Sequence, residues 1–270
     1  MDTRVSPPVM HKAPMWTPER HERILALLQQ RQRLTTDAFA AELGVSKETI
    51  RRDLIELEHS GKLSRVHGGA VPCSAVPEAS YAERTALFLP EKRAIAAAAA
   101  DLIAAGQSCF IDAGSTTHAL AQALQSVRDL LIVTNSVDVA ISLRGRADLQ
   151  VHLLGGSMAR DVPATYGEAT LAEIARYRLD WAISSPTALH PEQGAMDYDW
   201  QEAAVARAMM AQAGRTLLLA DANKLGGSSR VQVCNSQSID CLVTDVRADQ
   251  TLLERLGQAG VKHIIKADLT

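Results

Sequence analysis

The sequence predicts an α/β protein of two domains, a small N-terminal winged helix-turn-helix domain over residues 16–72 and a larger parallel-sheet α/β domain over residues 91–270. The first part shows the apolar periodicity of short helices, whereas the rest alternates leucine-rich or β-branched runs with helical segments, as a parallel sheet requires. Between them, residues 73–90 follow Pro72, contain Pro77 and Pro90, and have few large apolar side chains, which predicts a linker. A length of 270 residues, 47% of them hydrophobic, can supply both cores.

A first helix is expected over about residues 18–31, because the Thr17 hydroxyl can cap a helix that has Pro18 at its first position. A second, short helix is expected over about 35–42, before the turn at Gly44. A third helix follows at once, and two helices joined by a short turn form a helix-turn-helix.

The third helix has the features of a DNA-reading helix. Ser46 is a favoured N-cap, and Ile50, Leu54 and Leu57 recur at helical spacing, so one face packs inward. The opposite face is polar and carries Glu48, Thr49, Arg51 and Arg52. An arginine fork can pair with guanine edges, while hydroxyls and lysines can hold phosphates.

A basic hairpin is expected after this helix. Residues 61–66 and 67–69 would form its two-stranded wing, with Lys62 and Arg65 near backbone phosphates. For a single such helix, an amphipathic bundle with solvated arginines would be the better explanation. The combination of helix pair and hairpin favours DNA binding instead. Residues 1–72 hold 11 Lys and Arg against 9 Asp and Glu, and residues 73–270 hold 17 against 22, so the basic surface is local.

Seven strands are expected in the second domain, at residues 108–112, 130–134, 149–154, 180–184, 215–220, 239–244 and 261–265. Ligands of open parallel sheets bind at the carboxyl ends of the strands. Four of these ends have groups suited to a phosphate, at residues 112–117, 134–136, 155–156 and 221–224. The first of these loops offers three hydroxyls and free N–H groups at a helix N-terminus, where the helix dipole favours an anion.

Each of these loops also has a plain structural explanation. A capped loop, a tight turn or a solvated lysine accounts for any of them alone. Their convergence on one edge of one sheet favours an anion-binding site.

The stretches Val45-Ser46, Thr49–Leu54, Gly61 and Arg65–Ala70 together resemble the DNA-binding signature of the DeoR family of bacterial sugar-catabolism repressors. In that family the third helix enters the major groove. The resemblance therefore implies base or operator contacts by that helix, with Lys47 and the wing near phosphates. The expected DNA-binding residues are Thr36, Ser46, Lys47, Thr49, Arg51, Arg52, Lys62, Arg65 and His67.

The second domain resembles the C-terminal effector domain of the same family, which is related in fold to ribose-5-phosphate isomerase. There, the matching Gly-Ser-Thr-Thr, Thr-Asn-Ser, Gly-Gly and Ala-Asp-x-x-Lys motifs line a sugar-phosphate pocket. Together the two sets of motifs cover nearly the whole chain from about residue 18 onward. The expected effector-binding residues are Asp112, Gly114, Ser115, Thr116, Thr117, Asn135, Ser136, Gly155, Gly156, Glu202 and Lys224.

One segment departs from the family pattern. Many members carry Gly-Ala-Asp-Gly after the fourth strand, where this chain has Ser185-Pro186-Thr187-Ala188, so Thr187 stands at the carboxylate position. A threonine hydroxyl cannot act as a base near neutral pH, which argues against isomerase catalysis. Residues 196–202 are similar to a stretch in the glycerol-phosphate-type branch of the family, which also lacks that aspartate.

Five charged residues, among them Glu202 of the expected effector site, have two explanations each. Asp197, Asp199 and Glu202 are candidates for contacts with sugar hydroxyls, and solvated loop acids explain them equally well. Arg84 and Lys92 are candidates for binding the anion or coupling the domains, and surface or core-capping roles explain them at least as well.

The four cysteines, Cys73, Cys109, Cys234 and Cys241, have no paired metal-ligand spacing, so we expect free thiols, no metal and no cofactor. The N-terminus lacks the apolar core of a secretory signal, and no segment approaches a membrane span. A cytoplasmic location is therefore expected.

These observations predict a transcriptional regulator, in the role of a repressor, of a sugar or polyol catabolic operon, and not an enzyme. We expect a homo-oligomer that binds double-stranded operator DNA and responds to a phosphorylated sugar or polyol. The alternatives are a sugar-phosphate isomerase-like enzyme with a DNA-binding appendage, and an interaction module that uses DNA as a tether and has a vestigial pocket.

Overall fold

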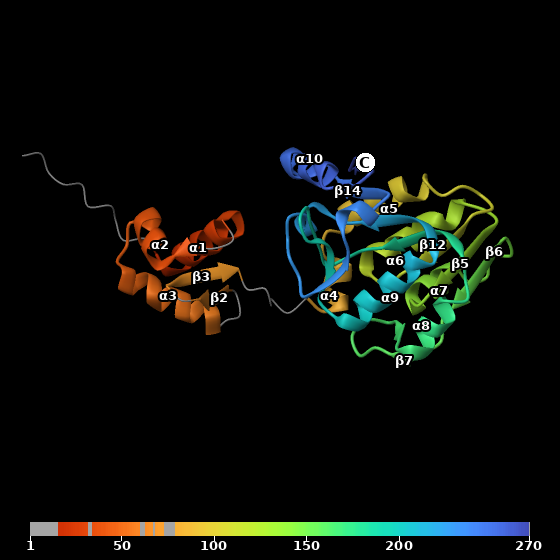
Figure 1. The fold of residues 1–270 in the computed structure, drawn as a ribbon, viewed down its shortest axis with the longest axis horizontal. Helices are drawn as coiled ribbons and strands as arrows, with labels where there is room; N and C mark the ends of the chain where they lie inside the picture. Colours follow the sequence, from red (N-terminus) through yellow and green to blue (C-terminus); the bar gives the residue numbers. More distant parts are fainter. Residues whose placement is uncertain (1–15, 32–33, 60–62, 67, 73–78, 270) are drawn as a thin grey trace, which may run out of the picture. The chain divides into compact units, whose positions relative to one another are not determined.

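The computed structural model describes residues 16–31, 34–59, 63–66, 68–72 and 79–269 (Figure 1). The chain divides into two compact units, Met1–Pro77 and Glu78–Thr270. Within the described ranges, no helix is both long enough and apolar enough to cross a membrane.

The N-terminal unit is a winged helix-turn-helix. Its elements are α1 (Thr17–Arg31), β1 (Leu34–Thr35), α2 (Thr36–Leu43), α3 (Lys47–His59), β2 (Leu63–Val66) and β3 (Gly69–Pro72). The strands form an antiparallel sheet in the order β1-β3-β2, so the residues after α1 add a third strand to the expected hairpin. The Thr35 hydroxyl caps α2 by accepting a 3.2 Å hydrogen bond from the Ala38 N–H, and Gly44, with φ of +66°, ends it in the left-handed conformation that glycine favours.

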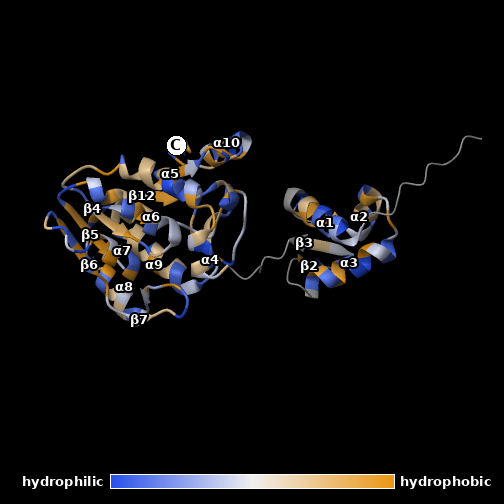
Figure 2. Ribbon diagram, turned by 180° about the vertical axis from the view of Figure 1, so that it is seen from behind, coloured by the Kyte–Doolittle hydropathy of each residue, from blue (hydrophilic) through white to orange (hydrophobic). Residues whose placement is uncertain are grey.

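The larger unit is built on a seven-stranded parallel sheet in the order β15-β14-β12-β9-β4-β5-β6. The strands are β4 (Ser108–Ile111), β5 (Leu130–Thr134), β6 (Leu149–Leu153), β9 (Leu179–Ser184), β12 (Ala213–Leu219), β14 (Cys241–Asp245) and β15 (His263–Ala267). All seven expected strands are therefore confirmed. The inner strands β4, β5 and β14 are largely buried because helices cover the sheet on both sides, and Figure 2 shows β5 as mainly apolar. The edge strands β6 and β15 are partly exposed.

Helices on the two faces bury different side chains of the same strands. On one face, α5 (Leu89–Ala100), α6 (Ser115–Ala123) and α7 (Val137–Leu143) enclose a core that includes Ile111. On the other face, α8 (Glu168–Ile174), α9 (Trp200–Ala211) and α10 (Gln250–Gln258) cover cores that include Phe110 and Leu218.

The strand order creates one switch point. From the central β4 the chain builds outward through β5 and β6, then returns to the other side of β4 with β9 and builds outward again. The loops after β4 and β9 therefore diverge at the carboxyl edge of the sheet, which is where open α/β sheets bind ligands.

Two small sheets lie outside the main one. β10 (Ala188–His190), β11 (Gly194–Asp197) and β13 (Val231–Cys234) form one, and β7 (Ser157–Met158) and β8 (Thr165–Tyr166) form the other. Single-turn helices span Leu124–Ser126, Ala222–Lys224 and Ser236–Ser238.

The stretch expected to be a linker contains helices. Residues 73–78 lie outside the described part of the chain, while α4 (Tyr81–Ala86) and the start of α5 fall within the larger unit. Ser80 and Glu83 form a capping box at the start of α4. Pro90, which in the sequence suggests a linker, stands in the first turn of α5, where proline is tolerated. The position of the domain boundary in the sequence stays a prediction.

Candidate functional site

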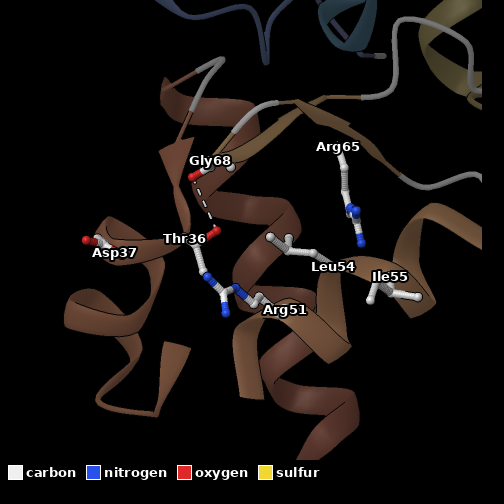
Figure 3. Close-up of a pocket in the computed structure, with 8 residues that line it drawn as sticks. Thr36, Asp37, Arg51, Leu54, Ile55, Arg65 and Gly68 are labelled. Atoms are coloured by element: carbon white, nitrogen blue, oxygen red, sulfur yellow. Dashed lines mark hydrogen bonds between the residues drawn. The ribbon is translucent and has the colours of Figure 1, made fainter. Parts of the chain in front are cut away.

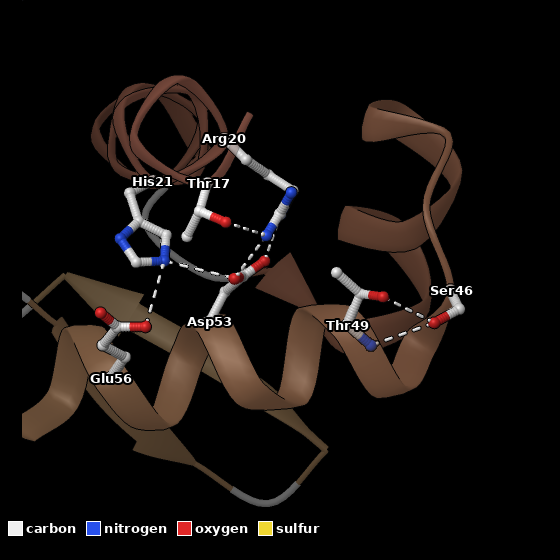
Figure 4. A network of polar contacts seen from close by, with 7 residues as sticks. All are labelled: Thr17, Arg20, His21, Ser46, Thr49, Asp53 and Glu56. Atoms are coloured by element: carbon white, nitrogen blue, oxygen red, sulfur yellow. Dashed lines mark hydrogen bonds and ion pairs between the residues drawn. The ribbon is translucent and has the colours of Figure 1, made fainter. Parts of the chain in front are cut away.

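The N-terminus of α3 is capped as expected. The Ser46 Oγ accepts a hydrogen bond of 3.0 Å from the Thr49 N–H and lies 2.8 Å from the Thr49 Oγ1 (Figure 4). Ser46 therefore orders the first turn of the helix that carries Arg51 and Arg52.

A buried ion pair fixes α1 across α3. The Arg20 guanidinium donates to the Asp53 carboxylate at 2.5 Å from Nε and 2.9 Å from Nη2, and the His21 Nε2 lies 3.3 Å from Asp53 Oδ1 (Figure 4). Both Arg20 and Asp53 are buried. Since Asp53 faces α1, Arg51 and Arg52 lie on the exposed side of α3. The pairing joins positions 33 residues apart, and the spacing within either helix does not reveal it.

A hollow of about 420 Å³ lies between α2, α3 and the wing (Figure 3). Arg51 from α3 and Arg65 from β2 both line it, and the Thr36 Oγ1 donates to the Gly68 carbonyl at 3.2 Å. The residues that line the hollow are Thr36, Asp37, Arg51, Leu54, Ile55, Arg65, Gly68 and Gly69. The structure thus places three of the expected DNA-binding residues around one concave surface, while Lys62 and His67 lie outside the described residues.

The exposed basic side chains of α3, one of which lines this hollow, have weak acidic partners. The Arg51 and Arg52 guanidinium groups lie 3.7 and 3.8 Å from the Glu48 carboxylate, and the Lys47 Nζ lies 2.8 Å from Asp37 Oδ2. All these side chains are exposed, and exposed pairs contribute about 0–1 kcal/mol. A phosphate or a base edge can therefore replace the acidic partners at little cost.

In the larger unit, the loop after β4 is buried and polar. The Asp112 carboxylate accepts hydrogen bonds from Ser184 Oγ at 2.8 Å and from the Ala113 N–H at 2.7 Å. Burial, and after it the nearby Asp197 carboxylate, raise the pKa of Asp112 to about 7. Asp112 thus joins the loop after β4 to the end of β9 at the switch point.

The hydroxyls that begin α6 differ in their contacts. The Thr117 Oγ1 donates to the Gly114 carbonyl at 3.0 Å. The Thr116 Oγ1 is buried and has no hydrogen-bond partner among the residues that the structure describes. A Cβ at Gly114 would lie 3.2 Å from the Thr117 Oγ1, so this position leaves little room for a side chain.

Asn135 and Ser136 hold neighbouring loops together. The Asn135 Oδ1 accepts from the Ala113 N–H at 3.1 Å, and its Nδ2 donates to the Thr165 carbonyl at 3.2 Å. The Ser136 Oγ caps α7 by accepting from the Val139 N–H at 3.3 Å. These contacts give both residues a structural role at the edge where the effector site is expected.

Gly155 and Gly156 pack against α8. The Gly155 N–H donates to Glu173 Oε2 at 3.0 Å, and its carbonyl accepts from Thr170 Oγ1 at 2.7 Å. A Cβ at Gly156, where φ is +147°, would lie 2.2 Å from the Thr170 Oγ1. Close packing therefore accounts for this glycine pair, and its contact with an effector stays a prediction.

Two lysines meet beside the switch point. The Lys224 Nζ donates to the Ser185 Oγ at 2.9 Å, and the buried Lys92 Nζ donates to the Arg84 carbonyl. Burial, and after it the charge of Lys224, lower the pKa of Lys92 to about 8. From sequence alone, Lys92 is a candidate for anion binding or domain coupling, or has a surface or core-capping role. In the structure it is buried and lies within electrostatic reach of Lys224.

Asp197 brings a carboxylate to Thr187, which stands where many family members have aspartate. Its Oδ1 accepts from the Thr187 N–H at 2.8 Å and from the Thr187 Oγ1 at 3.2 Å. Asp197 is buried at the end of β11, whereas Asp199 is exposed and caps α9 through the Gln201 N–H at 2.7 Å. Glu202 is half-buried in the first turn of α9.

Within the described ranges, no group of His, Cys, Asp and Glu side chains is arranged to hold a metal ion. Cys109, Cys234 and Cys241 are free thiols there, and Cys73 lies outside those ranges.

Residues 88–246 match the family described as the DeoR C terminal sensor domain, and residues 20–76 match the DeoR-like helix-turn-helix domain. The chain belongs to the DeoR family of transcriptional regulators. It is therefore a transcriptional regulator that binds DNA through its helix-turn-helix domain and has a sensor domain for a small molecule, and not an enzyme.

Relatives in the DeoR family align over most of their length. The chain is 33% identical to the HTH-type transcriptional repressor CsqR of Escherichia coli K12, over 91% of this chain and 94% of that protein. It is 36% identical to the glycerol-3-phosphate regulon repressor of Haemophilus influenzae, over 83% and 88% of the two chains.

Solved structures are much less similar. Ribose 5-phosphate isomerase A from Neisseria gonorrhoeae covers 49% of this chain and 52% of its own, with 18% identity and a TM-score of 0.37. That similarity is too low to support any inference about this DeoR-family chain.

Proposed function

We propose that this regulator represses a sugar or polyol catabolic operon and that its sensor domain binds a phosphorylated sugar or polyol. The observation that carries the proposal is the electrostatic proximity of the buried Lys92 to Lys224, whose Nζ donates to the Ser185 Oγ directly after β9. Two close ammonium groups, one of them buried, repel each other, and a phosphate dianion would relieve that repulsion. The name of the Haemophilus influenzae relative, a glycerol-3-phosphate regulon repressor, is consistent with such an effector.

The acidic side of the site supports a polyhydroxy effector. Asp112 and Asp197 are buried within electrostatic reach of each other, and carboxylates accept hydrogen bonds from sugar hydroxyls. The lysines would hold the phosphate, and the carboxylates would orient the carbon chain.

For DNA, we propose that Arg51 and Arg52 contact base edges and that Lys47, Arg65 and the Thr36 hydroxyl contact phosphates. The exposed face of α3 and the hollow beside it support this assignment. A symmetric homo-oligomer would read repeated half-sites, with the protein in the cytoplasm beside its operator. An effector that binds the DNA-incompetent arrangement more tightly would weaken operator affinity by its differential affinity for the two arrangements.

Calorimetric titration tests the effector class. The full chain is titrated with glycerol 3-phosphate, ribose 5-phosphate and fructose 6-phosphate, and with glycerol, ribose and fructose as matched compounds without phosphate. We expect at least one phosphorylated compound to bind and its unphosphorylated counterpart not to bind. Equal binding of both members of each pair, or of neither, would refute the proposal.

A further inference from the structure

Tyr166 carries a buried hydroxyl. The residue lies in β8 and is 3% exposed. Its hydroxyl oxygen has no hydrogen-bond partner among the residues that the structure describes. Burying a hydroxyl without a partner costs roughly 1–3 kcal/mol in proteins, so such a group points to a partner that is absent from the free chain.

The two ends of the Tyr166 side chain have different surroundings. Its ring belongs to an apolar cluster that includes Phe110, Val133 and Leu154. Burial raises the pKa of the phenol, and the nearby carboxylates raise it further; these are Glu202, Asp112, Asp197 and Asp199. The hydroxyl therefore stays protonated and is available as a donor among acidic groups.

The backbone holds Tyr166 next to the loops of the effector site. The Thr165 N–H donates to the Asn135 carbonyl at 2.9 Å, and the Thr165 Oγ1 donates to the Leu154 carbonyl at 2.8 Å. A strand fixed on both sides leaves the phenol little freedom to turn away. The hydroxyl is therefore preorganised on a strand held by Asn135 and Leu154, rather than carried on a mobile loop.

These groups make a complementary set for one kind of ligand atom. A carboxylate accepts a hydrogen bond and the protonated phenol donates one, whereas a ligand hydroxyl can do both at once. Resting on the proposed function, we propose that Tyr166 is a specificity-determining residue of the effector site, and that its hydroxyl donates to a hydroxyl of the bound polyol or sugar phosphate. The effector class is then a phosphate ester with a free hydroxyl on its carbon chain, which inorganic phosphate and simple alkyl phosphates lack.

The substitution Tyr166→Phe removes the hydroxyl and keeps the ring. The matched control is Tyr177→Phe, whose hydroxyl is exposed and lies 3.3 Å from the His152 Nδ1. Each full-length variant is titrated with glycerol 3-phosphate, ribose 5-phosphate and fructose 6-phosphate, and with propyl phosphate and inorganic phosphate as probes without a chain hydroxyl. Thermal unfolding is followed without ligand.

For Tyr166→Phe we expect about tenfold weaker binding of whichever polyol or sugar phosphate the wild type binds, the effect of losing one hydrogen bond. Binding of propyl phosphate and inorganic phosphate should not change. The melting temperature without ligand should stay the same or rise, because the substitution removes an unpartnered buried hydroxyl. Tyr177→Phe should bind as the wild type does.

Two results would overturn the assignment of Tyr166. One is unchanged affinity of Tyr166→Phe for the sugar or polyol phosphate. The other is a lower melting temperature with equal losses for all the phosphate probes, which would mean that the hydroxyl supports the fold. If the wild type binds none of the sugar or polyol phosphates, the proposed function fails first and the assignment fails with it.

Discussion

The Arg20 guanidinium on α1 donates two hydrogen bonds, of 2.5 and 2.9 Å, to the Asp53 carboxylate on α3, and both side chains are buried. A bidentate pair of this kind fixes orientation as well as distance. It sets the rotation of α3 about its own axis, and so determines which side chains of that helix are exposed.

Replacing Asp53 with alanine should destabilise the N-terminal unit by about 3–5 kcal/mol, because it leaves the Arg20 charge buried without its carboxylate. Chemical denaturation of the full chain, followed by a probe in that unit, measures the loss. The matched control is Glu42→Ala, which removes an exposed pair with Arg31 at 2.7 Å and should cost no more than about 1 kcal/mol. Equal effects of the two substitutions would contradict the structural role of Asp53.

Arg51→Ala and Arg52→Ala should each weaken binding to a selected operator by about 1–3 kcal/mol if the guanidinium contacts a base. Effector affinity should stay unchanged, since these residues belong to the other unit. Electrophoretic mobility shifts at physiological salt measure the change. Arg23→Ala on α1, which removes an exposed arginine paired with Glu19 at 3.0 Å, is the control. Wild-type operator affinity in both α3 variants would remove that helix from the interface.

Lys224→Ala should weaken binding of a phosphorylated effector by about 10- to 100-fold, the range expected for a hydrogen bond to a charged group. DNA binding without effector should be retained. Release of DNA by the effector and calorimetric titration give the two readouts. Lys262→Ala removes a lysine paired with Asp240 before β15, at the opposite edge of the sheet, and should have no effect. Full response to the effector in Lys224→Ala would exclude this lysine from the site.

Ser115→Ala and Thr116→Val should also reduce the response to a phosphorylated effector. Both side chains stand in the first turn of α6, and the Thr116 Oγ1 lacks a partner among the described residues. Each substitution removes one hydroxyl and keeps most of the shape. Their effect is measured as release of an operator fragment against effector concentration. If both variants release DNA at the wild-type concentration, the loop after β4 does not bind the effector.

Effector affinity should fall as the pH rises through about 8, because burial and Lys224 lower the pKa of Lys92 to about 8. A phosphate dianion favours the ammonium form of Lys92, so the effector binds best below that pH. Binding near pH 8 is accompanied by protonation of Lys92. A phosphate monoester is already a dianion across pH 7–9, because its second pKa is about 6. Titrations across this window should show affinity falling by up to about tenfold per unit above pH 8 in the wild type, and little change in Lys92→Gln.

Much of the fold follows from local sequence pattern. The strands of a parallel sheet covered on both faces are short continuous apolar runs, so segments such as 130–134 and 241–245 are visible directly. The gathering of loop residues at one edge follows from parallel topology alone. Helices α4 and α5 were harder to predict, because Pro90 indicates a linker as readily as the first turn of a helix.

The parts of the candidate site that the sequence left undecided or missed depend on contacts between distant segments. Asp197 reaches Thr187 from a strand outside the main sheet. Lys92, which has two explanations in the sequence, is buried and donates to the carbonyl of Arg84 in the last turn of α4. Tyr166 has the appearance of a core aromatic residue until its hydroxyl is found without a partner among the described residues. Burial and long-range pairing are set by the tertiary structure, so local patterns do not reveal them.

Selection of genomic DNA fragments by the purified protein at physiological salt, followed by sequencing of the retained DNA, tests the central claim most directly. We expect a few fragments that share a repeated motif and lie upstream of genes for sugar or polyol catabolism. An Arg51→Ala/Arg52→Ala double variant should not retain them. Retention without a common motif, abolished by modest salt and equal in the double variant, would contradict the account.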